Sequence, residues 1–306
     1  MRIGDSIGFS VRLCTFFAEQ DRLFTGYLRA EGQLVYSELT LLCAMHEAVQ
    51  PLALEPLAEL LMLSPRTVRS MLLDLEDKGF VSKLNDPEDR RFMLVQLTEH
   101  GRTVAERANR DIYLLMKESL WEALPESDFE DVLKKGMRHD VNHIRGFAVE
   151  PFGDLPHTDL PISVDHFIFW RIIVDRWTRT LRDESDLSLN DFCVLYYLSE
   201  CEKLISSEIA DALLLPRSAL SLCKSHLLES TLVSEQEEEG DGRKVVLSCT
   251  PQGKHLAKQM FEKLDALTRD IHSGMAEEDS GVVSAWYARM FSNMRKHRRK
   301  QSKAVK

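Results

Sequence analysis

The sequence predicts a mainly α-helical protein with small β hairpins, built from two copies of one unit. Residues 57–101 align without a gap with residues 209–253, at an offset of 152 positions. Identical pairs recur through the alignment, among them Leu61/Leu213, Thr98/Thr250 and Gly101/Gly253. Each copy reads as a helix, a tight turn, a second helix and a short hairpin. We therefore predict two winged helix-turn-helix domains in one chain, packed as an intrachain pseudo-dimer.

The elements around each copy are also repeated. Each half opens with a long amphipathic helix, followed by a mostly apolar and therefore buried helix. Each half closes with two long helices after the hairpin. The expected helices are residues 11–29, 38–47, 102–124 and 129–147 in the first half, and 165–182, 190–200, 254–273 and 282–300 in the second.

The division between the halves lies in the segment from Gly146 to Ser163, which holds two glycines and three prolines and has no sustained helical period. We predict a first winged-helix domain over residues 1–148, a linker over 149–163 and a degenerate second domain over 164–306. A length of 306 residues agrees with two domains of about 150 residues each.

Composition narrows the class of protein. Hydrophobic residues make up 44% of the chain, which suffices for full cores, and the longest apolar stretch is too short to span a bilayer. The N-terminal residues lack the pattern of a signal peptide, so we expect a cytoplasmic protein that does not associate with membranes. The sequence contains no nucleophile motif, phosphate loop or paired catalytic carboxylates. We expect neither an enzyme nor a cofactor.

The second helix of the first copy has the features of a DNA-reading helix. Ser64 is placed to cap it, and Pro65 stands where a missing amide is harmless. Val68, Met71 and Leu75 form a core-facing stripe. Short polar and cationic side chains on the opposite face suit contacts to phosphates and bases in a major groove. These residues are Arg66, Thr67, Arg69 and Ser70, together with the capping Ser64. An ordinary solvated helix face is the alternative interpretation.

The hairpin that follows predicts a wing with a cationic tip. Arg90 and Arg91 precede the strand 92–97, and an arginine at such a tip can enter a minor groove or pair with phosphate. The net charge of −10 argues against a protein that coats nucleic acid broadly, but it leaves room for such local basic elements.

This arrangement resembles the MarR (multiple-antibiotic-resistance regulator) family of bacterial transcription factors. The resemblance rests on LAELLMLSPRTVRSMLLDLEDKGFV, DPEDRR and LTEHG in the first half, and more weakly on IADALLLPRSAL and DGR in the second. It implies a DNA-binding regulator, with Arg66, Thr67, Arg69 and Ser70 reading the groove and Arg90 and Arg91 in the wing. Family members are usually homodimers, and many respond to small aromatic or oxidising ligands in a cleft. The fusion of two copies departs from the family and would make the dyad intramolecular, so that a monomer or a homodimer of the chain is expected.

The second copy differs where DNA contact is expected. Pro216 stands for Ser64, Ser221 for Arg69 and Gly242 for Arg90, and the hairpin 235–241 carries five carboxylates. Phosphates repel such a loop. Residues retained for contact are Arg217, Ser218, Ser221, Lys224, Arg243 and Lys244. Whether this copy contacts DNA stays open at this point.

Several other groups have two interpretations. Six aromatic and methionine residues either line a pocket for a small ligand or simply pack in the core. They are Phe16, Phe24, Tyr27, Tyr36, Met45 and Met71. His139 and His143 are spaced to share a helix face, but no third metal ligand is evident, which favours a surface pair and no metal. The six cysteines form no CxxC pair, and Cys14 is either a core thiol or an oxidant sensor.

Two functions from different classes remain. The first is a transcriptional regulator that reads double-stranded DNA mainly through the first winged helix and responds to a small aromatic ligand. The second is a protein-interaction module whose winged helices no longer bind DNA. The cations Arg66, Arg69, Arg90 and Arg91 favour the first function, and the acidic second wing favours the second.

Overall fold

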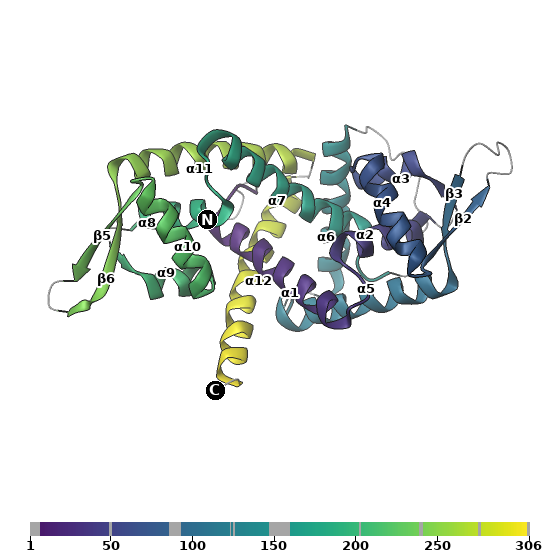
Figure 1. Ribbon diagram of the computed structural model, residues 1–306, viewed down its shortest axis with the longest axis horizontal. Coiled ribbons are helices and arrows are strands. Elements are labelled where there is room, and N and C mark those ends of the chain that lie inside the picture. Colours follow the sequence, from purple (N-terminus) through teal and green to yellow (C-terminus); the bar gives the residue numbers. More distant parts are fainter. Residues whose placement is uncertain are drawn as a thin grey trace. The chain divides into compact units, whose positions relative to one another are not determined.

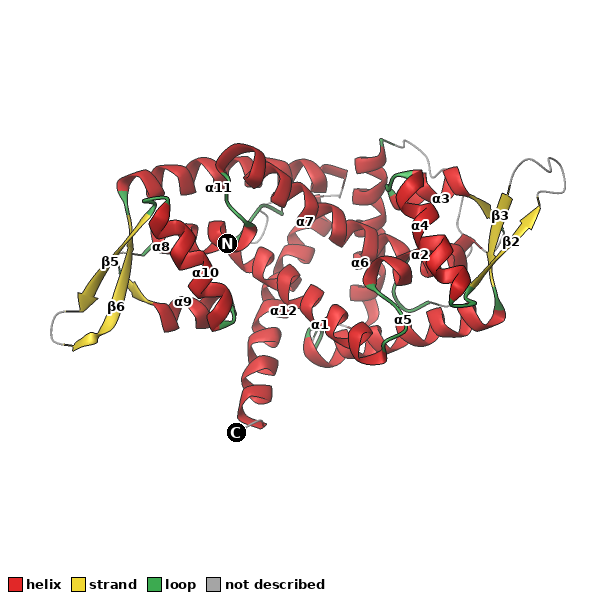
Figure 2. Cartoon of the chain, in the orientation of Figure 1, coloured by secondary structure: helices red, strands yellow, loops and turns green. Residues whose placement is uncertain are grey.

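The computed structural model describes residues 7–48, 51–85, 93–122, 124, 126–146, 160–201, 203–238, 241–274 and 277–304. It is mainly helical, with two small antiparallel sheets (Figure 1, Figure 2). The first repeat contains α1 (Val11–Glu31), α2 (Tyr36–Ala48), β1 (Leu52–Ala53), α3 (Leu54–Leu61), α4 (Pro65–Asp77), β2 (Val81–Asn85), β3 (Met93–Leu97), α5 (Glu99–Ser119) and α6 (Glu126–Arg145).

The second repeat follows the same order of elements. It contains α7 (Val164–Ser185), α8 (Leu189–Ser199), β4 (Leu204–Ile205), α9 (Ser206–Leu213), α10 (Arg217–Glu229), β5 (Val233–Glu238), β6 (Asp241–Cys249), α11 (Pro251–Ile271), η1 (His272–Gly274) and α12 (Glu277–Ala304). The predicted mainly α fold with two winged helices is therefore confirmed.

Three details differ from the prediction. A two-residue strand, β1 or β4, precedes each first helix of the helix-turn-helix and adds a third strand to each sheet. Such short strands carry too few residues for a period-2 pattern. Helix α5 begins at Glu99, three residues earlier than predicted, because Thr98 caps it. It ends at Ser119, whereas the predicted helix continues to residue 124. Helix α11 likewise begins at Pro251, after the cap Thr250.

The two sheets have the same topology. Their strand orders are β1-β3-β2 and β4-β6-β5, with every neighbouring pair antiparallel. Val81 pairs with Leu97 in the first hairpin, and Val233 pairs with Cys249 in the second. The second hairpin has an irregularity between Glu237 and Glu238, which the first hairpin lacks in its described part.

The structure divides into two compact units, and their boundaries do not coincide with the boundary between the two repeats. One unit comprises residues 20–171, and the other comprises residues 1–19 together with 172–306. The boundaries fall inside α1 and inside α7, so each unit contains part of the first helix of the other repeat. Residues 149–159 of the predicted linker lie outside the described residues, whereas Leu160, Ile162 and Ser163 are buried.

In the unit of residues 20–171, an aromatic cluster joins three helices. Phe24 of α1 is fully buried, and its ring lies 6.2 Å from Tyr36 of α2 and 5.8 Å from Trp170 of α7, centre to centre. The hydroxyl of Tyr36 donates to the carbonyl oxygen of Phe167 at 3.1 Å. The rings from α1 and α7 cover apolar surface of α2 that would otherwise face solvent.

The other unit has a corresponding cluster. Phe9 lies just before α1, and its ring contacts Trp177 of α7 at 5.1 Å and Phe192 of α8 at 5.7 Å. The indole Nε1 of Trp177 donates to Thr268 Oγ1 of α11 at 2.9 Å, which satisfies the buried donor. The N-terminal segment is held further by Asp265, whose Oδ1 accepts from the Phe9 amide at 2.9 Å.

A close approach of the backbone fixes where the wing meets the next helix in each repeat. Thr98 caps α5 by accepting from the Gly101 amide at 2.9 Å, and Thr250 caps α11 from Gly253 at 3.0 Å. A Cβ on Gly101 would lie 1.9 Å from the carbonyl oxygen of Phe80. At Gly253 the same atom would lie 2.0 Å from the carbonyl oxygen of Leu232. The identical Thr-x-x-Gly spacing in both repeats therefore has a steric cause.

We expect Gly101→Ala to lower the free energy of unfolding by about 1–3 kcal/mol, because the backbone of Phe80 must move away from the added methyl group. Gly26→Ala is the matched control: Gly26 lies in α1 with no atom within 4 Å of the added Cβ. That change should stabilise the helix by about 0.5–1 kcal/mol. Thermal unfolding followed by circular dichroism measures both, and equal midpoints for the two variants would contradict the close-approach argument.

Candidate nucleic-acid interface

The start of helix α4 is built as the sequence predicts. Ser64 is its N-cap: its Oγ accepts from the Thr67 amide at 3.1 Å and lies 2.7 Å from Thr67 Oγ1. Pro65 occupies the first turn, where its missing amide removes no hydrogen bond. The predicted stripe of Val68, Met71, Leu72 and Leu75 is buried. The hydroxyls of Ser64 and Thr67 are therefore partly engaged in capping.

The opposite face of α4 is open. All five residues predicted to read DNA on this helix are exposed, namely Ser64, Arg66, Thr67, Arg69 and Ser70. Among the described residues, neither Arg66 nor Arg69 forms an ion pair. Both guanidinium groups are therefore available to an anionic partner, and five donors on each can form two parallel bonds to a phosphate or a guanine.

The other end of α4 is anchored by a residue pair that the sequence analysis did not identify. Lys78 follows the helix, and its Nζ donates to both oxygens of Glu38 of α2, at 2.6 and 2.8 Å. The Glu38 side chain is only 5% exposed and that of Lys78 is 38% exposed, so solvent screens this pair less than it would a pair of fully exposed charges. Glu38 also accepts from the Val35 amide at 2.9 Å. Helix α4 is thus held at its C-terminal end by α2.

The predicted wing contacts cannot be placed in the same way. Arg90 and Arg91 lie outside the described residues. In the described part of the hairpin, Lys83 of β2 is exposed and forms an ion pair with Glu76 at the end of α4.

Helix α10 of the second repeat presents a different surface. Arg217, Ser218 and Ser221 are exposed as predicted, but Leu222 stands at the position of Ser70 and is 74% exposed. Pro216 occupies the N-cap position and supplies no side-chain hydrogen bond. An apolar side chain at the centre of this face can contact a thymine methyl group or a protein surface, but not a phosphate.

The remaining cation of that face is neutralised. Lys224 Nζ lies 2.5 Å from Glu235 Oε2 of β5. Under the repeat offset Glu235 replaces Lys83, so the charge on this strand is reversed between the two wings. Arg243 and Lys244 belong to β6, but their side chains are outside the described part of the molecule.

The residues predicted to line a ligand pocket are distributed over both compact units. Phe16 lies in the unit of residues 1–19 and 172–306, where its ring contacts Tyr287 of α12 at 5.7 Å. The other five lie in the unit of residues 20–171. Of these, Phe24, Met45 and Met71 are buried core residues, Tyr36 belongs to the aromatic cluster, and Tyr27 donates to Asp111 Oδ2 at 2.6 Å.

A cavity of about 810 Å³ lies in the unit of residues 1–19 and 172–306. It is bordered by the start of α1, by α8 and α9, and by α12. Aromatic and cationic side chains in its wall include Tyr196, Tyr197, Tyr287, Phe291, Arg12 and Arg295. Its volume is in the range of small-molecule sites, and Phe16 packs against its wall through Tyr287.

The two histidines considered for metal binding are exposed on α6. Across the described residues, no group of three or more histidine, cysteine, aspartate or glutamate side chains could hold a metal ion. In that same part of the chain, no helix combines the length and the apolar character needed to cross a membrane.

Cys14 is a buried thiol, which agrees with the core interpretation. Its Sγ lies 3.2 Å from Sγ of Cys193, and the two side chains are 3% and 4% exposed. The hydrogen bond to Cys14, together with burial, raises the pKa of the Cys193 thiol well above its usual range. Burial also raises the pKa of Cys43 and of Cys223, each to about 12.

Two family models match the chain. Residues 36–92 match the MarR family, and residues 176–260 match the family described as transcriptional regulator SarA/Rot. A curated relative is the uncharacterized HTH-type transcriptional regulator YdgJ of Bacillus subtilis (strain 168), which is 40% identical over 75 residues. That match covers 24% of this chain and 45% of the relative, so the chain spans less than half of the relative's length.

Similar solved structures include wild-type MarR from E. coli, with 26% identity over 39% of this chain and 89% of that chain, and a TM-score of 0.34. BldR from Sulfolobus solfataricus is 25% identical over 34% of this chain and 74% of that chain, with a TM-score of 0.33. FabT from Streptococcus pneumoniae in complex with DNA is 18% identical over 38% of this chain and 82% of that chain, with a TM-score of 0.35.

We expect buried thiols to react more slowly than exposed thiols when the native protein is treated with a disulfide reagent such as Ellman's reagent at pH 8. A pKa of about 12 leaves only about one Cys43 or Cys223 in ten thousand as the reactive thiolate at this pH. Cys201 is only half-buried and should supply the fast phase, which Cys201→Ser should remove. Rapid labelling of Cys14 in the native protein would instead support the sensor interpretation.

Proposed function

We propose that the chain is a MarR-type winged-helix regulator with two repeats, which binds double-stranded DNA and regulates transcription; the matches of residues 36–92 and 176–260 to two families of transcriptional regulators support this. The base-reading element is α4 of the first repeat. The observation that carries this proposal is the exposed outer face of α4, where Arg66 and Arg69 follow the cap residue Ser64 and neither pairs with a carboxylate in the described part of the chain. A capped helix N-terminus with free guanidinium groups suits the edge of a base pair and the adjoining phosphates.

We also propose that the single chain acts as a pseudo-dimer. Support comes from the composition of the compact units, each of which includes residues of the other repeat's first helix. In one unit Trp170 of α7 packs on Phe24, and in the other Phe17 of α1 packs on Trp177 at 5.6 Å. An exchange of an equivalent element between two copies is one of the ways in which two-fold dimers form.

The two repeats differ in function under this proposal. Helix α4 reads bases, whereas α10 holds its half-site loosely or not at all, because Lys224 is paired with Glu235 and Leu222 replaces Ser70. Operator symmetry follows protein symmetry, so the operator should have two unequal half-sites.

A second candidate function applies to α10. Its exposed Leu222 and the neutralised Lys224 favour contact with a protein over contact with DNA. If the footprint covers only one half-site, the second winged helix is free for such a partner.

Ligand response belongs to the proposal as well. We place it at the cavity between α1, α8, α9 and α12, where aromatic side chains and two arginines, which outnumber the one carboxylate of Glu200, suit a small aromatic carboxylate. A ligand there would touch both the start of α1 and the first helix of the second helix-turn-helix.

The reading role is tested with a duplex selected from a random pool by the wild-type chain. Arg69→Ala should cost about 1–3 kcal/mol in binding and relax the preference at one base pair. Ser221→Ala, the same position in the second repeat, is the matched control and should change binding by less than about 0.5 kcal/mol. Equal losses from both changes, or two equal protected half-sites in a footprint, would rule out the asymmetry. Failure of the wild-type chain to select any sequence would rule out the regulator.

The cavity is tested by thermal unfolding with a panel of small aromatic carboxylates. A ligand at ten times its Kd should stabilise the folded state by about 1.4 kcal/mol. Ala288→Trp, which fills the cavity, should abolish the stabilisation, and Arg295→Gln should reduce it because the carboxylate loses its counter-charge. Ala18→Trp on the exposed face of α1 is the control and should leave the shift intact. A shift that survives Ala288→Trp would place the ligand elsewhere.

A further inference from the structure

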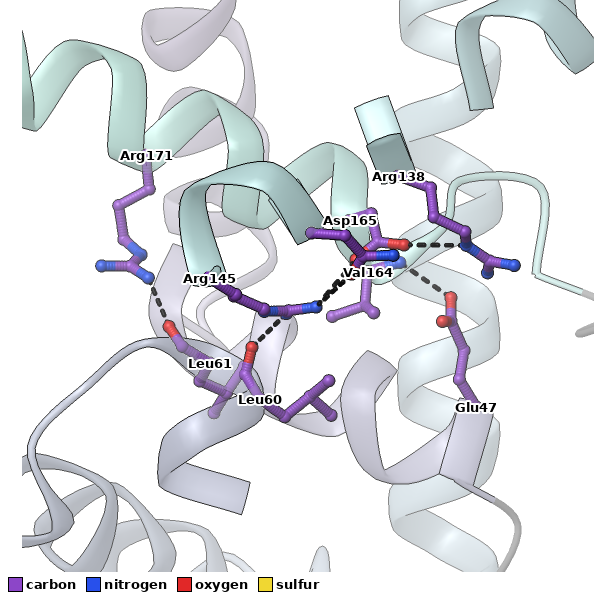
Figure 3. A network of polar contacts seen from close by, with 9 residues as sticks. Glu47, Leu60, Leu61, Arg138, Arg145, Val164, Asp165 and Arg171 are labelled. Atoms are coloured by element: carbon purple, nitrogen blue, oxygen red, sulfur yellow. Dashed lines mark hydrogen bonds and ion pairs between the residues drawn. The ribbon is translucent and has the colours of Figure 1, made fainter. Parts of the chain in front are cut away.

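The C-terminal end of α3 is held by two arginines from the long helices of its unit (Figure 3). Arg145 of α6 donates to the carbonyl oxygen of Leu60, and Arg171 of α7 donates to that of Leu61. The last carbonyls of a helix have no partner within it and carry a partial negative charge. A guanidinium group can therefore bind these carbonyl oxygens directly, and the contact needs no carboxylate from α3.

These arginines are part of a wider network. The carboxylate of Asp165 at the start of α7 accepts from Arg138 Nε at 3.1 Å and lies 3.7 Å from Arg145 Nη1. The side chains of Arg145 and Asp165 are each only 5% exposed. Glu47 of α2 accepts from the Val164 amide at 2.7 Å and so holds the first turn of α7 (Figure 3). Buried charges that are paired in this way leave their positions only at a high free-energy cost.

The same kind of contact occurs in the other unit. Arg298 of α12 donates to the carbonyl oxygen of Leu214, the residue that ends α9, and its guanidinium lies 3.8 Å from Glu19 Oε2. Leu214 corresponds to Met62 in the repeat, and both residues have left-handed backbones, with φ of 54° and 51°. The turn of the helix-turn-helix is therefore held by arginine in both repeats, although the arginines come from different helices.

Only Met62 and Leu63 separate α3 from Ser64, the cap of α4. The Met62 and Leu63 amides bond back to α3 through the carbonyls of Glu59 and Ala58, both at 3.0 Å. A displacement of the end of α3 is therefore passed directly to the first two turns of α4, which carry Arg66 and Arg69. Bidentate base contacts tolerate displacements of only about 0.5 Å.

We propose that Arg145 and Arg171 are positioning residues for base reading: they fix the end of α3, and through the turn they set α4 for its contacts with DNA. This inference rests on the proposed DNA-binding function. It adds that the long helices α6 and α7 control the reading helix through these two side chains. Asp165 and Glu47 hold Arg145 and α7 in place for that task.

The test compares binding to the selected duplex with binding to a random-sequence duplex at one salt concentration. Arg171→Gln and Arg145→Gln should each weaken binding to the selected duplex about five- to tenfold and change binding to the random duplex less than about twofold. Arg171→Lys keeps one donor for Leu61 and should restore most of the affinity. Arg298→Gln removes the similar contact to the Leu214 carbonyl in the second repeat and should leave both affinities unchanged, since α10 reads no bases under the proposed function.

A second arm separates positioning from a general loss of folding. In an Arg69→Ala background, Arg171→Gln should reduce affinity less than about twofold, because the contact it positions is already absent. Full additivity of the two changes, or a proportional fall in both duplex affinities and in the unfolding midpoint, would overturn the inference.

Hydrogen exchange keeps the proposal testable without any DNA. Arg171→Gln should accelerate exchange of the amides in residues 62–68 about tenfold, with residues 104–116 of α5 unchanged. If the wild-type chain selects no duplex, the regulator proposal fails, while the exchange measurement still decides whether the arginines set α4. Unchanged exchange in residues 62–68 would show that they do not.

Discussion

Burial of helix α2 is the constraint on which the first winged helix depends. Its residues from Glu38 to Glu47 are all buried, so apolar surface must cover it on every side. The winged helix contributes α3, α4 and α5, and the remaining cover comes from Phe24 of α1 and from Phe167 and Trp170 of α7. Because α7 belongs to the second repeat, the first winged helix does not complete its core from its own repeat.

The same burial explains the polar contacts of α2. A carboxylate in a core has to be paired, and each acidic residue of this helix is used to hold another element. Glu38 binds Lys78 after α4, and Glu47 accepts from the first turn of α7. His46 lies 3.0 Å from Glu106 of α5. Helix α2 thus connects α4 to the long helices α5 and α7, and Arg145 of α6 and Arg171 of α7 add a second connection through the end of α3.

The two repeats share a backbone but carry different chemistry. The caps Thr98 and Thr250, the close approaches at Gly101 and Gly253 and the left-handed Met62 and Leu214 are common to both. The side chains on the helix-turn-helix differ between the two repeats, at exposed positions above all. The exposed Ser70 of α4 is replaced in α10 by the exposed Leu222, and the buried Leu72 is replaced by Lys224, which pairs with Glu235.

Much of the fold and of α4 could be predicted from the sequence, because the relevant signals are local. A cap at Ser64, a stripe of Val68, Met71, Leu72 and Leu75 and the exposed face opposite all follow from the helical period. The second winged helix could be predicted because its sequence aligns with that of the first without a gap. Arg90 and Arg91 lie outside the described residues and stay a prediction.

Contacts between distant residues could not be predicted. Arg171 and Leu61 are separated by 110 positions, Lys78 and Glu38 by 40, and no periodicity connects them. The cavity is formed where residues 7–15 meet α8, α9 and α12, so its wall depends on how the repeats exchange helices. The sequence by itself determined most of the helices and the two hairpins, their repetition and the exposed polar and cationic face of α4, since these depend on neighbours along the chain. Only the tertiary structure decided the division of α1 and α7 between units and the arginines that hold α3, because burial and charge pairing select among many partners of equal chemistry.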